Sequence, residues 1–177
     1  MITQTKIRFF IIPMVLIGIL LMISTAQAYD YKTYPGMTCK PYFANTSSRI
    51  DNRLDGVYNN SATAATWVAC PVIRDDKTGT NGFGGTTWVR VYRDGISRTA
   101  MTCYLRQQDV LDSTPGTVLG SDSESWTGTG WRWLSLNITG AGRSQNWGPA
   151  VMYCYVPPRS KVYSYTVYEE TPTDSNN

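Results

Sequence analysis

The sequence contains no histidine among its 177 residues. This absence removes the commonest general base, the commonest metal ligand and the side chain that titrates near physiological pH. A Ser-His-Asp triad or a Cys-His pair is therefore excluded. Charge is also scarce, because Lys, Arg, Asp and Glu make up only 16% of the chain. Without a basic face or charge block, we expect no nucleic acid as a partner. We also expect no metal and no cofactor.

Long hydrophobic runs are limited to the N-terminus. Lys6 and Arg8 precede an apolar run over residues 9–23, and residues 26–28 read Ala-Gln-Ala. A basic start, an apolar centre and a small-residue site are typical of a cleaved secretory signal peptide. The alternative is a membrane anchor, which the proline and the glycine inside the run disfavour. We expect residues 1–28 to be removed, leaving no membrane anchor and a protein secreted to the extracellular space or the periplasm.

The mature chain is expected to be nearly neutral. Removal of the signal peptide takes two of the 16 basic residues and leaves 14 beside 13 acidic ones. The remaining length is that of one ordinary domain with a real core. We expect this domain at residues 29–169, followed by a disordered polar tail at residues 170–177.

Four cysteines stand in this chain, at positions 39, 70, 103 and 154, and spacing alone allows three pairings. Cys103 and Cys154 each lie at the centre of an alternating segment, with Met two residues before and an aliphatic residue two after. We expect these two to face each other across a β-core and to form one disulfide, which leaves Cys39 to pair with Cys70. A metal site would need closely spaced ligands or histidine partners, and neither is present.

Helical periodicity is absent, and short alternating runs rich in Val, Tyr, Trp and Thr recur between Gly, Asn, Asp and Pro. The expected strands lie near residues 37–43, 56–60, 65–73, 86–93, 99–107, 116–120, 131–138, 150–157 and 160–169. Asp94-Gly95 predicts a hairpin, and residues 74–85, 128–130 and 140–148 are expected loops. This pattern predicts an all-β fold: a single antiparallel β-sandwich, jelly-roll-like or immunoglobulin-like, with two disulfides.

Alternation also separates the two faces of the expected strands. In residues 87–92 and 131–138 one face is aliphatic and core-like, whereas the other carries aromatic and Arg side chains. The outward residues of these two segments are Trp88, Arg90, Tyr92, Trp131 and Trp133. The outward residues beside the two central cysteines are Thr102, Tyr104, Arg106, Tyr153 and Tyr155. Arg132 is the exception, since it falls on the core side, and we expect it to reach solvent from the rim of its sheet.

Candidate catalytic groups reduce to carboxylates, the pair used by glycoside hydrolases. The Asp and Glu residues fall nearly all in expected loops and turns, where they serve turn chemistry and solvation. None lies in the middle of a strand on the aromatic face. We therefore expect no enzyme and no catalytic residues.

Two segments resemble a group of small uncharacterised secreted bacterial proteins. One is Val68-Ala69-Cys70-Pro71-Val72, and the other is Tyr153-Cys154-Tyr155-Val156-Pro157-Pro158. The resemblance implies an exported, disulfide-bonded β-fold of bacterial origin. It implies no activity and no functional residues.

The hypothesis from sequence is a secreted, non-catalytic recognition protein that binds glycan or another extracellular surface. Its ligand-binding residues would be Trp88, Arg90, Tyr92, Trp131 and Trp133. Cross-strand aromatic pairs also stabilise ordinary sheets, so the same pattern fits a purely structural role. The first alternative is a structural or self-associating protein of a cell surface or matrix, and the second is a secreted carboxylate-based glycoside hydrolase.

Overall fold

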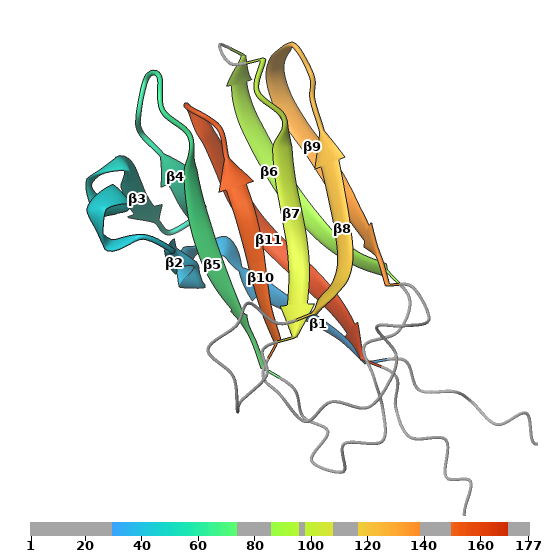
Figure 1. Cartoon of the computed structure of the whole chain (residues 1–177). Helices are drawn as coiled ribbons and strands as arrows, with labels where there is room; N and C mark the ends of the chain where they lie inside the picture. The colour runs from blue at the N-terminus through green and yellow to red at the C-terminus, as the bar shows by residue number, and fades with distance from the viewer. Residues whose placement is uncertain (1–29, 74–85, 96–97, 108–116, 139–149, 170–177) are drawn as a thin grey trace, which may run out of the picture.

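The computed structural model describes residues 30–73, 86–95, 98–107, 117–138 and 150–169 (Figure 1). The expected signal peptide, the loops at 74–85 and 140–148 and the polar tail lie outside these residues. Within the described part the chain forms eleven β-strands and two short 3-10 helices, η2 (Gly36–Thr38) and η3 (Ala44–Arg49).

The strands form two antiparallel sheets that face each other as a sandwich, as the sequence pattern predicts (Figure 1). Sheet I has the order β3 (Ile50–Arg53), β4 (Gly56–Asn59), β11 (Ser160–Glu169), β6 (Thr86–Gly95) and β9 (Gly128–Asn137), and β1 (Asp30–Pro35) also pairs with β11. Sheet II has the order β2 (Lys40–Pro41), β5 (Thr66–Val72), β10 (Ala150–Val156), β7 (Met101–Gln107) and β8 (Val118–Glu124).

The core lies between the two sheets and follows the period of two. Strands β5, β6, β7 and β10 each bury every second residue over most of their length. Val89 and Val91 from sheet I are fully buried, and so are Met101 and Met152 from sheet II. The predicted core residues of β9 and the position after it, Leu134, Leu136 and Ile138, are buried as well. The alternation therefore assigns the inner faces correctly.

Both disulfides have the predicted pairing, but the place of the Cys103–Cys154 bridge differs from the expectation. Cys103 bonds to Cys154, and Cys39 bonds to Cys70. Cys154 lies directly opposite Cys103 on the neighbouring strands β10 and β7 of sheet II. The bridge therefore ties two strands of one sheet and does not cross the core. Alternation predicts that a residue faces inward, yet it carries no information on which sheet its strand joins.

Several expected elements are corrected by the structure. The segment expected as a strand at 37–43 contains the end of η2 and the two-residue strand β2. Strands β1 and β3 were not expected, since neither shows a clear aliphatic alternation. Asp94-Gly95 does not join a hairpin, because β6 and β7 lie in different sheets and Gly95 pairs instead with Gly128. The loop expected at 128–130 is the beginning of β9.

A β-bulge in β11 changes which residues face outward. Val162 lies opposite Val91 and Ser164 lies opposite Arg90, so Tyr163 is the extra residue between them. Bulges of this kind re-aim a side chain. Two glycines pack on the bulged backbone: a Cβ at Gly36 or Gly56 would overlap the Val162 carbonyl oxygen.

Arg93 closes the core at one end of the sandwich. Its side chain is fully buried, and Nη1 donates a hydrogen bond of 2.7 Å to the Trp126 carbonyl oxygen. Nη2 donates to the Thr99 carbonyl oxygen, and the guanidinium carbon lies 4.3 Å from the centroid of a Trp126 ring. Burial lowers the pKa of Arg93. Arg132, by contrast, is exposed near the same end and donates to the Trp131 carbonyl oxygen, as expected for a rim position.

Tyr165 connects the two sheets through the core. It lies on β11 of sheet I, and its hydroxyl donates to the carbonyl oxygen of Pro71 on β5 of sheet II. Its ring stacks on Tyr34 with centroids 5.1 Å apart. Burial raises the pKa of Tyr165 from 10.0 to about 12. The neutral phenol is thus the form that the fold accommodates.

This raised pKa predicts a loss of stability at alkaline pH. The contribution of the neutral Tyr165 phenol is complete below the unfolded pKa of about 10 and disappears as pH rises through about 12. We expect the free energy of unfolding to fall more steeply between pH 10 and pH 12 in the wild type than in Tyr165→Phe. Urea titrations across this range, with phenolate absorbance as a second readout, measure the difference. Parallel pH profiles for the two proteins would contradict the assignment.

Candidate functional site

The outer face of sheet I carries a cluster of aromatic and basic side chains. Arg90 and Tyr92 come from β6, Trp131 and Trp133 from β9, and Tyr163 from the bulge of β11. The register places Arg90 opposite Trp133 and Tyr92 opposite Trp131. These five residues are called the Arg90 face below.

The Arg90 guanidinium lies among three aromatic rings. Its carbon is 4.7 Å from a ring centroid of Trp131, 5.1 Å from that of Tyr163 and 5.8 Å from that of Trp133. Contacts of this kind are cation–π interactions, which hold a guanidinium in place while its N–H groups remain available. Trp131 and Trp133 are 39% and 54% exposed. Two large flat rings therefore lie open beside a positioned donor group.

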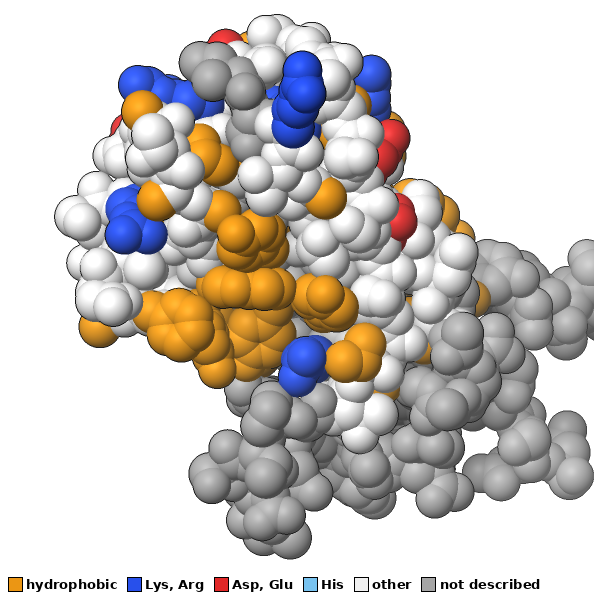
Figure 2. All heavy atoms as spheres, turned by 45° about the horizontal axis from the view of Figure 1, so that its top comes forward, with side chains coloured by type: hydrophobic (Ala, Val, Ile, Leu, Met, Phe, Trp, Pro, Cys, Tyr) orange, Lys and Arg blue, Asp and Glu red, His pale blue; other side chains and the backbone are white. Residues whose placement is uncertain are grey.

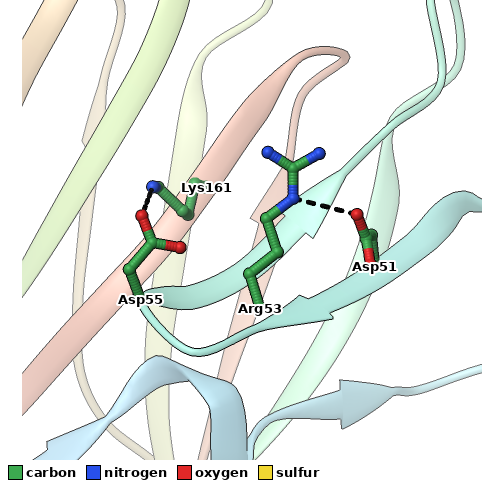
Figure 3. Close-up of polar contacts among 4 residues, drawn as sticks. All are labelled: Asp51, Arg53, Asp55 and Lys161. Atoms are coloured by element: carbon green, nitrogen blue, oxygen red, sulfur yellow. Dashed lines mark hydrogen bonds and ion pairs between the residues drawn. The ribbon is translucent and has the colours of Figure 1, made fainter.

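A second cation, Lys161 of β11, lies at the margin of this face. Its Nζ is 5.4 Å from a Trp131 ring centroid and 5.6 Å from that of Tyr92. Lys161 forms an ion pair with Asp55 of the turn between β3 and β4 (Figure 3). The hydrogen bond that Lys161 Nζ donates to Asp55 Oδ2 lowers the pKa of the Asp55 carboxyl. The positive charge of Lys161 is thus balanced by the Asp55 carboxylate, whereas no carboxylate among the described residues pairs with Arg90.

The neighbouring ion pair belongs to the same edge of sheet I. Arg53 Nε donates to Asp51 Oδ2 over 2.9 Å (Figure 3). The Arg53 guanidinium carbon also lies 4.2 Å from the Tyr58 ring centroid. The hydrogen bond that Arg53 donates to Asp51 raises the pKa of Arg53. Asp51 and Asp55 are therefore both engaged with cations, and the pKa of Asp55 is lowered, whereas a general acid needs a raised one.

Trp88 lies on the same outer face as the other four predicted site residues, but beside a different set of rings. It is half-buried and 5.8 Å from Tyr31 of β1 between ring centroids. With Trp133, Ser135 and Thr166 it lines a shallow hollow of about 400 Å³. The structure therefore brings all five predicted side chains onto one face of sheet I. Their role in ligand binding stays a prediction.

A second aromatic cluster lies on the outer face of sheet II, where the sequence assigned no site. It lines a cavity of about 200 Å³ and is called the Trp67 face below; its residues are Tyr42, Phe43, Trp67, Tyr104, Arg106 and Tyr153. Figure 2 shows a patch of hydrophobic side chains with a basic side chain at its margin. Tyr104, Arg106 and Tyr153 were expected to point outward, as they do. Trp67 was missed although it alternates with the buried Thr66 and Val68.

The described residues contain no group of three or more Cys, Asp or Glu side chains placed to hold a metal ion. A search of the same residues finds no helix long and apolar enough to cross a membrane. The four cysteines are all bonded in disulfides. Such bridges are typical of proteins that fold in an oxidising compartment outside the cytoplasm.

Comparison with protein families and with curated proteins gives no match. Among solved structures, a xylan-binding module, CBM15, superposes with a TM-score of 0.55 at 10% sequence identity, covering 80% of this chain and 97% of the module. A carbohydrate-binding module specific for non-crystalline cellulose, CBM28, gives a TM-score of 0.38 at 10% identity over 75% of this chain and 84% of that one. The coat protein of Tobacco streak virus gives 0.38 at 12% identity, with coverage of 88% and 94%. The chain thus has the β-sandwich fold seen in the xylan-binding module.

Proposed function

We propose that this protein is a secreted, non-catalytic recognition protein that binds glycan through the Arg90 face. The observation that carries the proposal is the position of Arg90 among Trp131, Trp133 and Tyr163 on the outside of a rigid sheet. A ligand at this face would meet exposed rings and a fixed set of hydrogen-bond donors together.

The chemistry of sugars matches this combination. The C–H face of a pyranose packs on a flat ring, and the exposed parts of Trp131 and Trp133 offer such surfaces. Sugar hydroxyls and carboxylates accept hydrogen bonds, and the planar Arg90 guanidinium donates up to five in a fixed fork. Because the cation–π contacts already fix Arg90, binding would cost little side-chain entropy.

Three of the described carboxylates have structural partners, which supports recognition over hydrolysis. Asp51 and Asp55 are held in ion pairs at the edge of sheet I. Asp122 of β8 accepts hydrogen bonds from the backbone N–H groups of Ser123 and Ser135, at 2.8 and 2.7 Å. These partners give Asp51, Asp55 and Asp122 structural roles. The xylan-binding module of the same fold provides a second, weaker line of support, through its own polysaccharide ligand.

Replacement of both Trp131 and Trp133 by Ala is expected to abolish the binding of neutral polysaccharides at the Arg90 face. The full chain, produced by export into an oxidising compartment, is screened against neutral polysaccharides with intrinsic Trp fluorescence as readout. The unfolding free energy of the double variant should fall by no more than about 2 kcal/mol, because only exposed aromatic contacts are lost. Ile73→Ala, at a 64% exposed apolar position outside the Arg90 face, is the matched control and should bind normally.

Two results would count against this proposal. A stability loss above about 3 kcal/mol would place the two rings in the core, where large-to-small substitutions have that cost. Absence of binding to every polysaccharide, together with concentration-dependent assembly in size-exclusion chromatography, would favour the self-associating alternative.

A further inference from the structure

The Trp67 face is separate from the Arg90 face, because the two lie on the outer surfaces of different sheets. Four of its six lining residues come from three neighbouring strands of sheet II: Trp67 from β5, Tyr153 from β10, and Tyr104 and Arg106 from β7. Tyr153 lies directly opposite Tyr104 in the register. The floor of the cavity is therefore built on regular, hydrogen-bonded backbone.

The remaining wall comes from the segment after β2. The Tyr42 N–H donates a hydrogen bond of 2.9 Å to the Trp67 carbonyl oxygen, which extends the pairing of β2 with β5 by one residue. The Tyr42 ring meets the Tyr153 ring edge to face, at 89° and 5.1 Å between centroids. Tyr42 and Phe43 are both about half exposed, and their rings also meet edge to face. This ring-on-ring packing holds the wall of the cavity in place.

The positive charge of the cavity lining favours a ligand with a negative charge. Arg106 is the single charged residue among the described residues that line it, and its guanidinium carbon lies 5.7 Å from the Tyr104 ring centroid. No carboxylate of the described chain pairs with Arg106. A cationic ligand would be repelled, whereas a ligand carboxylate would gain a charge-assisted, bidentate hydrogen bond.

The size of the cavity limits the ligand to one ring. At about 200 Å³ it is smaller than the roughly 300–1,000 Å³ of sites for drug-sized molecules. Its aromatic lining suits a saturated ring with an apolar face, and Arg106 suits an acidic substituent on that ring. A hexuronate unit, which is a pyranose carrying a carboxylate, combines these properties.

We propose that the Trp67 face is a second binding site, which takes a hexuronate unit of an acidic polysaccharide with Arg106 paired to its carboxylate. The site goes beyond the proposed function of the Arg90 face and uses none of its residues. Because the two faces lie on opposite sides of the sandwich, one molecule would engage two polysaccharide chains.

Isothermal titration calorimetry with a trisaccharide of galacturonate tests this site, with the neutral galactose trisaccharide as the matched probe. The parent protein for the test is the Trp131→Ala, Trp133→Ala variant, in which the Arg90 face is disabled. It should still bind the acidic trisaccharide, and the neutral one at least tenfold more weakly. Arg106→Gln in this background should weaken binding of the acidic probe by about tenfold or more, since a hydrogen bond to a charged group is lost.

Arg98→Gln is the control, because it removes the same charge from an exposed position outside the cavity lining. It should bind the acidic trisaccharide like the parent. The proposal is overturned if Arg106→Gln binds like Arg98→Gln, or if the parent variant binds neither probe while thermal melting shows that it is folded. Loss of neutral-polysaccharide binding by the Trp131→Ala, Trp133→Ala variant concerns the Arg90 face, whereas loss of acidic-trisaccharide binding by the same variant concerns the Trp67 face, so the two proposals fail by different results.

Discussion

Substitution of Gly56 by Ala is expected to lower the free energy of unfolding by about 3 kcal/mol or more. Gly56 begins β4 with φ of +136°, a conformation that residues with a Cβ rarely adopt. Its Cβ would also overlap the carbonyl oxygen of Val162 and lie 2.9 Å from the Cα of Tyr163. Both atoms are backbone, so β4 or the bulge of β11 has to move.

Gly128→Ala is the matched control for this substitution. Gly128 also has a positive φ, of +93°, but a Cβ there meets nothing within 4 Å. Its cost should be that of the backbone conformation alone, about 1–2 kcal/mol. Urea unfolding of both variants measures the difference. Equal losses would show that the close approach of β4 to the bulge contributes nothing.

Gly56→Ala should also impair ligand binding at the Arg90 face. Tyr163 is the extra residue of the bulge, and its ring lies 5.1 Å from the Arg90 guanidinium carbon. Displacement of the bulge would therefore remove one wall around Arg90. We expect Gly56→Ala to weaken glycan binding even at a temperature where the protein remains folded, and Gly128→Ala to leave it unchanged.

Removal of the Cys103–Cys154 disulfide, by replacing both residues with Ala, is expected to cost about 4 kcal/mol. The two cysteines are 51 residues apart, and the chain-entropy model gives about that value for a loop of this length. Guanidinium unfolding of the double variant against the wild type measures it. The Cys39→Ala, Cys70→Ala pair, with a separation of 31 residues, should lose slightly less.

This disulfide also bears on the Trp67 face. Tyr104 follows Cys103 and Tyr153 precedes Cys154, and these two tyrosines are directly opposite each other in the register of β7 and β10. The bridge fixes that register from the inner side of sheet II. For the disulfide prediction itself, a loss of unfolding free energy below about 1 kcal/mol in the Cys103→Ala, Cys154→Ala variant would contradict it. Such a result would mean that the unfolded chain gains little freedom when the bridge is removed.

The inner and outer faces of the strands were predictable from the sequence, because side chains of a strand alternate strictly. Val89 and Leu134 face inward, whereas Arg90 and Trp133 face outward, as expected. In β11 the alternation breaks at the bulge, where one inserted residue turns Ser164 outward beside Tyr163 and sends Tyr165 into the core. No residue type marks this insertion in the sequence.

The membership of strands in the two sheets was not predictable in the same way. Pairing depends on which strands meet in space, and a period of two is identical for a neighbour in the same sheet and for a partner across the core. Cys103 and Cys154 were therefore assigned to opposite sides of the core, and Asp94-Gly95 to a hairpin. For the same reason the sequence does not show that the outward aromatic residues of β6 and β9 lie on one sheet and those of β7 and β10 on the other.

The central claim, that glycan binds at the Arg90 face, is tested most directly by the indole N–H resonances of the tryptophans in an NMR titration. The chain has six Trp residues, and each gives one such signal. With oligosaccharides of xylan, cellulose and polygalacturonate as probes, the signals of Trp131 and Trp133 should shift in a saturable manner. The signal of Trp126, which is buried beside Arg93, should stay in place. If no probe moves the signals of Trp131 and Trp133, or if all the assigned signals move together, the account is contradicted.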